Sequence, residues 1–324
     1  MSTGDTTSCR FRNTVAWGDG DKDTQPYVGG ADGSTLATLR HTYADVPKLF
    51  VVKITGKTTA GSCFVATGRL EFTLMCPAAP ASPKLSASAT TPQWTGYVAR
   101  TNPPGTDCGF TSVTGRWVQP TVTCPTTNLG DQEVDFWVGL DGLENDGSHT
   151  VEQTGVEVTC LWNSGTDTYI GPTYRAWYEM FPNLPIYTGS GYSALEPTPG
   201  STITATVTYD GNAKQNPYAL TLTVTSGDKT KSGTVHETCL NVDSQPCINT
   251  NAEWITEKVD GRGLASFAPW KLTAGYATTE ANPANQSVAA LHATAFDLKP
   301  KGSRTLAYAC RLKGATFTVQ QPAC

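Results

Sequence analysis

The chain has 324 residues, with 28 acidic and 23 basic side chains and a formal net charge of −5. This mildly acidic balance leaves no basic stripe of the kind that binds nucleic acid. No apolar run approaches the roughly 20 residues that are needed to span a bilayer. We therefore predict neither a nucleic-acid partner nor a membrane partner.

The composition indicates a protein built almost entirely of β-strands. Gly occurs 31 times and Pro 21 times, and apolar residues alternate with threonine instead of recurring at helical spacing. A chain of this length forms two domains or one large β domain, and it can bury a core without help from metals. We predict an all-β fold.

Ten cysteines are spread along the chain. They form no CxxC motif, and the histidines do not have the spacing of zinc ligands, so the pattern favours disulfides over metal binding. Disulfides form in oxidising compartments, and residues 1–15 are polar rather than signal-like. We expect a mature, secreted, extracellular chain that acts as a monomer without a metal or another cofactor.

The first predicted strands lie in residues 14–23 (TVAWGDGDKD) and 39–56 (LRHTYADVPKLFVVKITG). A Gly-Asp-Gly turn ends the first, and the second contains alternating apolar residues. The WGDG and HTYA elements resemble the polycystic-kidney-disease (PKD) type of domain, a small Ig-like β-sandwich. The resemblance implies that residues 1–76 form such a domain, in which Asp19 and His41 set turns and packing.

A stretch rich in Pro, Ala and Ser follows over residues 77–92. It carries one charge, Lys84, and no aromatic residue or periodic apolar pattern, which is typical of an interdomain linker. We therefore predict a second domain over residues 93–324.

The cysteines on the two sides of this linker are odd in number. Three precede it and seven follow it, so complete pairing requires at least one disulfide between the two regions. The spacing offers three local pairs, Cys63–Cys76, Cys239–Cys247 and Cys310–Cys324, which leaves Cys9 to reach across.

Three segments after the linker gather carboxylates and amides: WTGYVAR (94–100), DFWVGLDG (135–142) with VEQTGVE (151–157), and YRAWYEMFP (174–182). The chain lacks the Asp-Thr-Gly motif of aspartic proteases, the HExxH motif and the Gly-x-Ser-x-Gly motif. Cysteines that are paired provide no thiolate nucleophile. Carboxylates and amides therefore remain as the candidates for chemistry.

Residues 201–227 (STITATVTYDGNAKQNPYALTLTVTSG) contain the clearest hairpin. Each of its two strands alternates apolar residues with threonine or another residue, and a turn with Asp210-Gly211 separates them. Similar strands recur to residue 320. We predict two antiparallel sheets packed face to face.

NTNAEWITE (249–257) completes an ordered set of motifs. The set resembles the glutamic peptidase (eqolisin) family, whose patterns read Trp-x-Gly-Tyr, Trp-Val-Gly-(Ile/Leu)-Asp-Gly, Gln-(Thr/Ala)-Gly, Ala-Trp-Tyr-Glu and Ala-Glu-(Trp/Phe)-Ile. The resemblance runs from Trp94 to the C-terminus and is closest to bacterial-type members. It implies an antiparallel two-sheet β-sandwich of the concanavalin- or lectin-like jelly-roll type, with Gln153 and Glu253 as the catalytic residues.

These two residue types suit peptide hydrolysis. Glu253 can take a proton from water as a base and then give it to the leaving nitrogen as an acid. The amide NH₂ of Gln153 can donate to the developing oxyanion, and its C=O can orient the water. Strand residues i and i+2 share a face, so Gln153 and Gly155 point one way, and Glu152 and Thr154 point the other. We expect Glu152 to be solvated.

The resemblance implies that further positions line or support the site: Trp137, Asp141, Glu157, Tyr178 and Glu179. Trp137 can equally pack in the core, and Asp141 can equally form a turn ahead of a glycine. Glu179 lies between aromatic residues and needs a partner or a raised pKa.

Fungal members of the family typically have Asp where this chain has Glu157 and Arg175. If Arg175 lies near Glu253, it favours the ionised glutamate. A glutamate base that must later donate a proton predicts activity on the acid side, at roughly pH 3 to 5 given the reference pKa. We expect protein or peptide substrates.

Two other functions stay open at this point. A glycoside hydrolase would use Glu179 and Glu253 as its carboxylate pair and would not need Gln153. A non-catalytic carbohydrate-binding β-sandwich would bind without turnover.

Overall fold

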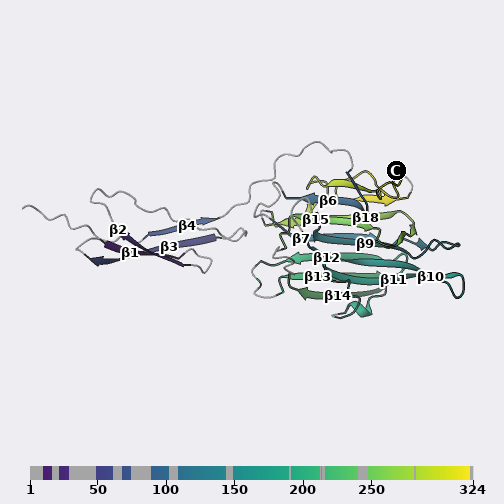
Figure 1. Ribbon diagram of the computed structural model, residues 1–324, viewed down its shortest axis with the longest axis horizontal. Helices are drawn as coiled ribbons and strands as arrows, with labels where there is room; N and C mark the ends of the chain where they lie inside the picture. The colour runs from purple at the N-terminus through teal and green to yellow at the C-terminus, as the bar shows by residue number, and fades with distance from the viewer. Residues whose placement is uncertain are drawn as a thin grey trace, which may run out of the picture. The chain divides into compact units, whose positions relative to one another are not determined.

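The computed structural model describes residues 10–16, 22–28, 49–60, 68–73, 89–101, 109–143, 149–189, 191–211, 213, 216–239, 247–280, 282–321 and 324. The chain divides into two compact units, Met1–Pro77 and Ala78–Cys324. Almost every regular element is a β-strand, and the exception among the described residues is the 3-10 helix η2 (Tyr192–Ala194) (Figure 1). The all-β prediction is confirmed. No helix in this part of the chain is long and apolar enough to cross a membrane.

The N-terminal unit contains one antiparallel sheet in the order β2-β1-β3-β4. Its strands are β1 (Arg10–Ala16), β2 (Lys22–Val28), β3 (Leu49–Ala60) and β4 (Gly68–Thr73). The described residues of this unit include no second sheet, so the Ig-like sandwich and the PKD assignment stay predictions. Asp19 and His41 lie outside the described residues.

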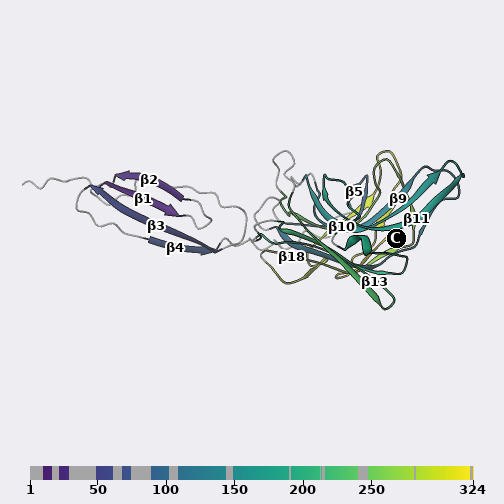
Figure 2. The ribbon, with the colours of Figure 1, turned by 90° about the horizontal axis from the view of Figure 1, so that it is seen from below.

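The C-terminal unit is a sandwich of two eight-stranded sheets, seen as two layers in Figure 2. We call the first the β9 sheet. Its order is β11 (Thr168–Phe181), β10 (Val151–Asn163), β9 (Gln132–Asp141), β15 (Asn251–Glu257), β6 (Trp94–Arg100), β20 (Thr294–Leu298) and β5 (Ala89–Thr91), with β16 (Gly263–Leu264) beside β9. Its pairs are antiparallel except β20 with β5 and β9 with β16.

We call the second the β12 sheet. Its order is β14 (Lys229–Glu237), β13 (Tyr218–Ser226), β12 (Thr202–Tyr209), β7 (Phe110–Val118), β18 (Trp270–Thr279), β22 (Phe317–Gln320) and β21 (Tyr308–Ala309), with β19 (Gln286–Ser287) beside β18. A separate pair joins β8 (Val122–Thr123) to β17 (Ser266–Phe267). The predicted two-sheet sandwich is confirmed.

The hairpin predicted over residues 201–227 forms β12 and β13. Their register pairs Ile203 with Val224 and Tyr209 with Tyr218. Ile203, Ala205 and Val207 are buried and the threonines between them are partly exposed, as the period-two pattern requires. The apolar stripe of this hairpin therefore fixes which of its faces meets the β9 sheet.

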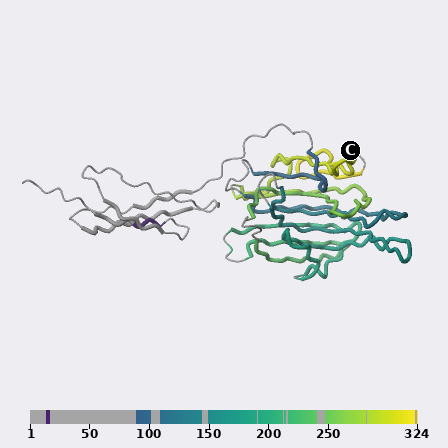
Figure 3. Tube along the Cα trace, viewed as in Figure 1, coloured from purple at the N-terminus to yellow at the C-terminus, as the bar shows by residue number. Residues whose placement is uncertain are grey.

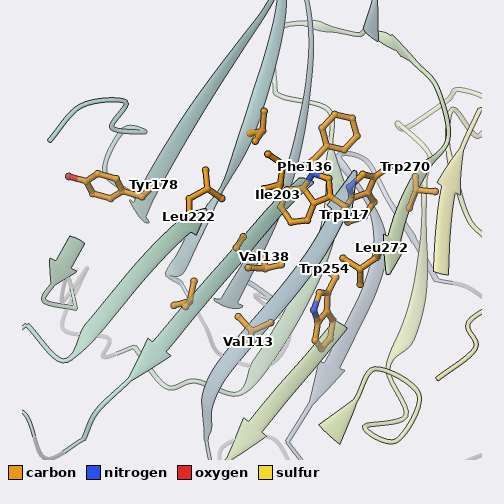
Figure 4. Packing of buried hydrophobic residues seen from close by; sticks show 14 of the residues in the cluster. Val113, Trp117, Phe136, Val138, Tyr178, Ile203, Leu222, Trp254, Trp270 and Leu272 are labelled. Atoms are coloured by element: carbon orange, nitrogen blue, oxygen red, sulfur yellow. The ribbon is translucent and has the colours of Figure 1, made fainter. Parts of the chain in front are cut away.

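Large side chains from the two facing sheet surfaces form the core between the layers (Figure 4). Phe136 and Trp254 of the β9 sheet meet Trp117, Trp270 and Leu272 of the β12 sheet, and all five are buried. Buried aromatic side chains of this size dominate core energetics. This packing holds β9 and β15 side by side and so fixes the opposite surface of the β9 sheet, which carries the candidate site.

The first strand of the C-terminal unit lies inside the region predicted as a linker. Residues 89–91 of the predicted linker (77–92) form β5, which pairs in parallel with β20, because Ala-Thr-Thr suits an edge strand. Strand β20 also pairs with β6, so segments from the two ends of this unit run side by side (Figure 3). The unit thus closes its sheet with its own beginning and end.

Three disulfides join the described cysteines of the C-terminal unit: Cys124–Cys160, Cys239–Cys247 and Cys310–Cys324. The predicted local pairs Cys239–Cys247 and Cys310–Cys324 are confirmed, and no described cysteine is free. The other predicted local pair and the predicted bridge between the regions concern four cysteines outside the described residues, Cys9, Cys63, Cys76 and Cys108. Both stay predictions.

Candidate active site

Gln153 and Glu253 lie on the outer face of the β9 sheet, the face turned away from the β12 sheet. Thr154 and Trp254, their strand neighbours, point the other way, toward the β12 sheet. Gln153 on β10 and Glu253 on β15 are both directly opposite Gly139 of the intervening strand β9. Two strand spacings put their Cα atoms about 10 Å apart. The predicted pair therefore shares one face and one row of the sheet.

Two glycines lie beside this pair in close packing. A Cβ at Gly139 would lie 3.2 Å from Gln153 Cβ and 3.0 Å from Trp137 Cζ3, between the two functional side chains. A Cβ at Gly142 would lie 3.0 Å from Glu253 Oε2, and the φ of +114° at this position also favours glycine. A side chain at either glycine of the WVGLDG motif would therefore crowd Gln153 or Glu253.

Glu179 holds the side chain of Gln153. Gln153 Nε2 donates to Glu179 Oε2 at 2.5 Å, across the β10–β11 pair in which the two residues are directly opposite. Gln153 is 5% exposed, and its Oε1 is buried and accepts no hydrogen bond from the described residues. One end of the amide is therefore anchored, while the acceptor end is available.

Glu253 is 0% exposed, and neither of its carboxyl oxygens has a hydrogen-bond partner within the described ranges. Burial raises the pKa of Glu253 well above its ordinary value, and the nearby acids Asp141, Glu257 and Glu152 raise it further, while Arg100 lowers it. A carboxyl in this environment favours its neutral form, which can donate a proton. It ionises readily only when a water or a substrate group provides hydrogen bonds.

Asp141 positions the start of the strand that carries Glu253. Its Oδ2 accepts from the backbone N–H groups of Ile248 and Asn249 at 2.8 and 2.9 Å, and its Oδ1 accepts from that of Thr250 at 2.8 Å. Burial raises the pKa of Asp141 to about 6, and these hydrogen bonds oppose the rise. Asp141 also has a φ of 65° at the end of β9, which agrees with the turn interpretation, and its role in supporting a site stays a prediction.

A second row of acids crosses the same face four residues along the strands. Asp135 on β9 is opposite Glu157 on β10 and Glu257 on β15. Arg175 and the hydroxyl of Tyr187 both donate to Glu157. Burial raises the pKa of Asp135 well above its ordinary value, and Glu157 and Glu257 raise it further. These acids are buried together and therefore depend on protons and nearby donors to offset their charge.

Two tryptophans cover Glu257. Trp137 Nε1 donates to Glu257 Oε2 at 2.9 Å, and the Trp94 ring lies edge-on to the Trp137 ring with centroids 5.3 Å apart. Burial raises the pKa of Glu257 to about 7, and hydrogen bonds from Trp94 and Trp137 oppose the rise. Trp137 therefore combines the two roles left open by its sequence, packing and support of an acid on the candidate face.

The carboxylates of Glu133, Asp135 and Glu157 have oxygen atoms within 4.8 Å of one another, the arrangement that could hold a cation. Two of the three already face arginines, because Arg262 pairs with Glu133 and Arg175 pairs with Glu157. A cation would have to compete with these guanidinium groups, so the cluster gives no support to metal-dependent chemistry.

Three sequence expectations need correction. Glu152 is 0% exposed rather than solvated, because both faces of β10 are buried. Tyr178 points away from Gln153 into the core between the sheets, where its ring lies 5.0 Å from that of Tyr192, because it alternates with Trp177 and Glu179 along β11. Arg175 pairs with Glu157, and the cation that lowers the pKa of Glu253 is Arg100.

Sequence reasoning did not single out Asp135, Glu257 or Trp94. Period-two spacing provides the signal for two of them, since Asp135 shares a strand face with Trp137 and Glu257 shares one with Glu253. Trp94 meets Glu257 only through the pairing of β6 with β15, for which the sequence carries no local signal.

The arrangement has a clear chemical capacity. Glu253 can exchange a proton with a bound water, and the Gln153 amide can donate to a carbonyl oxygen and accept from that water. Both residues are opposite Gly139, and this face of the sheet also carries the buried side chains of Trp137 and Trp177. Donors in such an environment act more strongly than in bulk solvent.

The sequence is similar to that of a known peptidase family. A family model described as the Peptidase A4 family matches residues 92–321. Among solved structures, the crystal structure of scytalido-glutamic peptidase with a transition state analog inhibitor is 19% identical, with a TM-score of 0.48, and the match covers 70% of this chain and 97% of that chain. No curated protein sequence matches the chain. The family match includes every strand of the β9 sheet from β6 onward.

Proposed function

Because the chain belongs to the peptidase A4 family, the family of glutamic peptidases predicted from its motifs, we propose that it is a secreted acid endopeptidase with Gln153 and Glu253 as its catalytic pair. As a peptidase, it acts on proteins or peptides. Family membership shows the class of enzyme. The two-residue mechanism, the acid range and secretion are proposals.

One observation carries the mechanism. Gln153 and Glu253 face each other across Gly139 in one row of the sheet, and each has a buried oxygen without a hydrogen-bond partner among the described residues. Buried polar atoms that lack partners are uncommon and call for a ligand, a water or a catalytic use. A peptide group and a water in this space would satisfy both side chains.

Hydrolysis then follows in two proton transfers. Ionised Glu253 takes a proton from the water, whose oxygen bonds to the carbonyl carbon of the substrate, and the carbonyl oxygen becomes an oxyanion that accepts a hydrogen bond from Gln153 Nε2. Protonated Glu253 next gives that proton to the amide nitrogen as the C–N bond breaks. The products are a carboxylic acid and an amine, and Glu253 returns to its ionised form.

The proposed acid range has a lower and an upper limit. Glu253 must ionise to act as the base, and burial raises its pKa, so the acidic limb should lie above that of a free glutamate, whose pKa is about 4.3. The same residue must be protonated to release the amine, which disfavours high pH. We therefore expect the optimum to lie below neutrality. It should lie near or above the upper end of the range of roughly pH 3 to 5 that the reference pKa gives.

The glycoside hydrolase alternative fits the geometry poorly. Glu179 and Glu253 are three strands apart, which separates their Cα atoms by roughly 14 Å, and Gln153 stands between them in the row. Paired carboxyl groups of glycosidases flank the scissile bond with only the sugar and a water between them. The intervening amide favours the peptidase.

The test is proteolysis of denatured casein at acid pH with pepstatin present, read as new amino termini. Glu253→Gln and Gln153→Ala should each lower turnover by about 10² to 10⁴ without changing the circular dichroism spectrum. Glu196→Gln, at an exposed glutamate paired with Lys231, and Gln286→Ala are the matched controls. Activity near that of the wild type in either catalytic variant would remove the proposed pair.

We extend the proposal to the domain organisation. A PKD-like module over residues 1–76 and a linker that ends before β5 would precede a peptidase domain that begins with β5 (Ala89–Thr91). The abundance of cysteines and the three disulfides in the C-terminal unit support an oxidising, extracellular location.

A further inference from the structure

Glu179 is the one acid of the outer face that contacts Gln153 directly among the described residues. It is half-buried at a position directly opposite Gln153, and its Oε2 accepts from Gln153 Nε2 at 2.5 Å. A carboxylate oxygen accepts hydrogen bonds and an amide nitrogen donates them, so this contact specifies which end of the amide faces β11.

We propose that Glu179 is a positioning residue that fixes the orientation of the Gln153 amide, so that Oε1 and the second N–H hydrogen remain for the water and the oxyanion. The proposal rests on the proposed function, because it assigns Gln153 the role of oxyanion donor. Glu179 itself touches neither the substrate nor the reacting atoms in this account.

The need for such a residue follows from the symmetry of the amide. A Gln side chain can rotate by about 180° at its end, which exchanges an acceptor oxygen for a donor nitrogen with little change in shape. The reversed amide would present an oxygen to the oxyanion and repel it. An acceptor on the β11 side disfavours the reversed form, because two oxygen atoms would then face each other.

The charge of Glu179 matters for the same reason. Burial, followed by the charge of Glu257, raises the pKa of Glu179 to about 7, and the hydrogen bond from Gln153 lowers it. In acid Glu179 is therefore neutral, so its carbonyl oxygen accepts from Gln153 Nε2, and its O–H group must point away from the amide for the orientation to be fixed. Above neutrality it becomes a carboxylate next to the donor that must hold a negative oxyanion, which opposes catalysis.

Several charged or titratable groups share this environment and set the background for any pH effect. They lie on the acid-bearing face of the four neighbouring strands or on the segment after β11: Asp135, Glu157, Arg175, Tyr187 and Glu257. Arg175 and Tyr187 both donate to Glu157 rather than to Glu179. Glu179 is thus the group of this cluster whose ionisation acts on Gln153 by direct contact.

The test compares Glu179→Gln with Glu179→Leu, two variants of similar volume of which only the first keeps an oxygen acceptor. At acid pH, Glu179→Gln should retain kcat within about fivefold. Glu179→Leu should lower kcat about 10- to 100-fold with little change in KM, because a wrongly oriented amide loses part of the rate enhancement that an oxyanion donor provides. The wild-type profile should also contain a loss of kcat near pH 7 that Glu179→Gln lacks. Glu196→Gln and Glu196→Leu are the surface controls, and circular dichroism restricts the data to folded enzyme.

A second readout does not depend on turnover. In protein labelled with ¹⁵N at glutamine, the side-chain NH₂ signals that disappear in Gln153→Ala belong to Gln153. These signals should titrate near pH 7 in the wild type and in Glu253→Gln, and they should not do so in Glu179→Gln. If Gln153→Ala kept its activity, the proposed function would fail while this titration could still be measured.

Two outcomes would overturn the proposal. One is a Glu179→Leu enzyme with wild-type kcat and pH profile. The other is an equal loss in the Gln and Leu variants with no titration of the Gln153 NH₂ signals, which would mean that Glu179 does not act through the amide.

Discussion

The outer faces of the two sheets in the C-terminal unit carry different kinds of polar side chain. On the β12 sheet, hydroxyl groups pair across strands, as in Thr221 with Thr234 at 2.9 Å and Thr223 with Ser232 at 2.9 Å. On the β9 sheet, the corresponding face carries carboxyl groups that are buried among tryptophans. Hydroxyl groups do not titrate where carboxyl groups do, so pH acts on the acids of the β9 sheet and does not act on these hydroxyl pairs.

The difference teaches how one fold combines stability and chemistry. Threonine suits strands and forms neutral cross-strand pairs that keep the β12 sheet polar at any pH. The fold accommodates the acids of the β9 sheet for two reasons. Burial raises their pKa values and so keeps them largely protonated in acid, and nearby donors form hydrogen bonds with some of them. The working range of the enzyme and the stable range of its fold should therefore coincide.

The largest effect that we predict is a loss of stability of the C-terminal unit between about pH 4 and pH 7. The pKa values of Glu179 and Glu257 are about 7 in the folded chain, against about 4.3 for glutamate in an unfolded chain. As pH rises through this window the unfolded chain loses its protons first, so the free energy of unfolding falls, by about 1.4 kcal/mol per pKa unit for each group. Urea unfolding at pH 4 and pH 7 measures the fall.

Two substitutions sharpen this prediction. Glu152 is buried with a raised pKa, so Glu152→Gln should stabilise the fold at pH 7 more than at pH 4. Thr221→Val on the β12 sheet should change stability by less than about 0.5 kcal/mol, the usual size for a surface substitution, and equally at both pH values. A wild-type fold that is more stable at pH 7 than at pH 4 would contradict the assignment of these acids as neutral groups.

The second prediction concerns the space over Gly139. In Gly139→Ala the new Cβ would lie 3.2 Å from Gln153 Cβ and 3.0 Å from Trp137 Cζ3. These contacts are tight enough to displace the side chain of Gln153. A displacement of about 1 Å can cost 10²-fold in rate, so kcat/KM should fall about 100-fold. Gly165→Ala in the exposed turn between β10 and β11 is the matched control. Equal activity in the two variants would show that this space is not used by the substrate.

The third and smallest effect concerns Asp141. Asp141→Asn leaves one acceptor oxygen and places an NH₂ group against backbone donors of residues 248–250, so stability should fall by about 2 kcal/mol. Asp131→Asn is the control, because Asp131 Oδ1 accepts a hydrogen bond from Trp162 N in an exposed position. Thermal unfolding ranks the two variants. A larger loss in Asp131→Asn would mean that the start of β15 does not depend on Asp141.

Strand periodicity made part of this structure predictable. The alternation of apolar residues in the hairpin set the inner face of β12, and the same rule placed Gln153 and Gly155 together. Period-two spacing assigns residues to the two faces of a strand but does not tell whether one face or both are buried. In β10 both faces are buried. Glu152 was therefore expected in solvent and lies in the core.

Register across distant strands was beyond the sequence alone. Asp141 accepts hydrogen bonds from residues 107 to 109 positions away, and Trp137 donates to Glu257 from 120 positions away. The motifs identified Gln153 and Glu253 through resemblance. Their placement on either side of Gly139, and the hold of Glu179 on the amide, depend on strand pairing that only the folded chain reveals.

The most direct test of the central claim, that Gln153 and Glu253 act together on one peptide group, is the kcat/KM of the double variant Gln153→Ala/Glu253→Gln. Residues that act as a unit have strongly non-additive effects, so the double variant should be no slower than the slower single variant within about threefold, a difference of about 0.65 kcal/mol. Losses that multiply in the double variant would mean that the two side chains act independently, and would contradict the account.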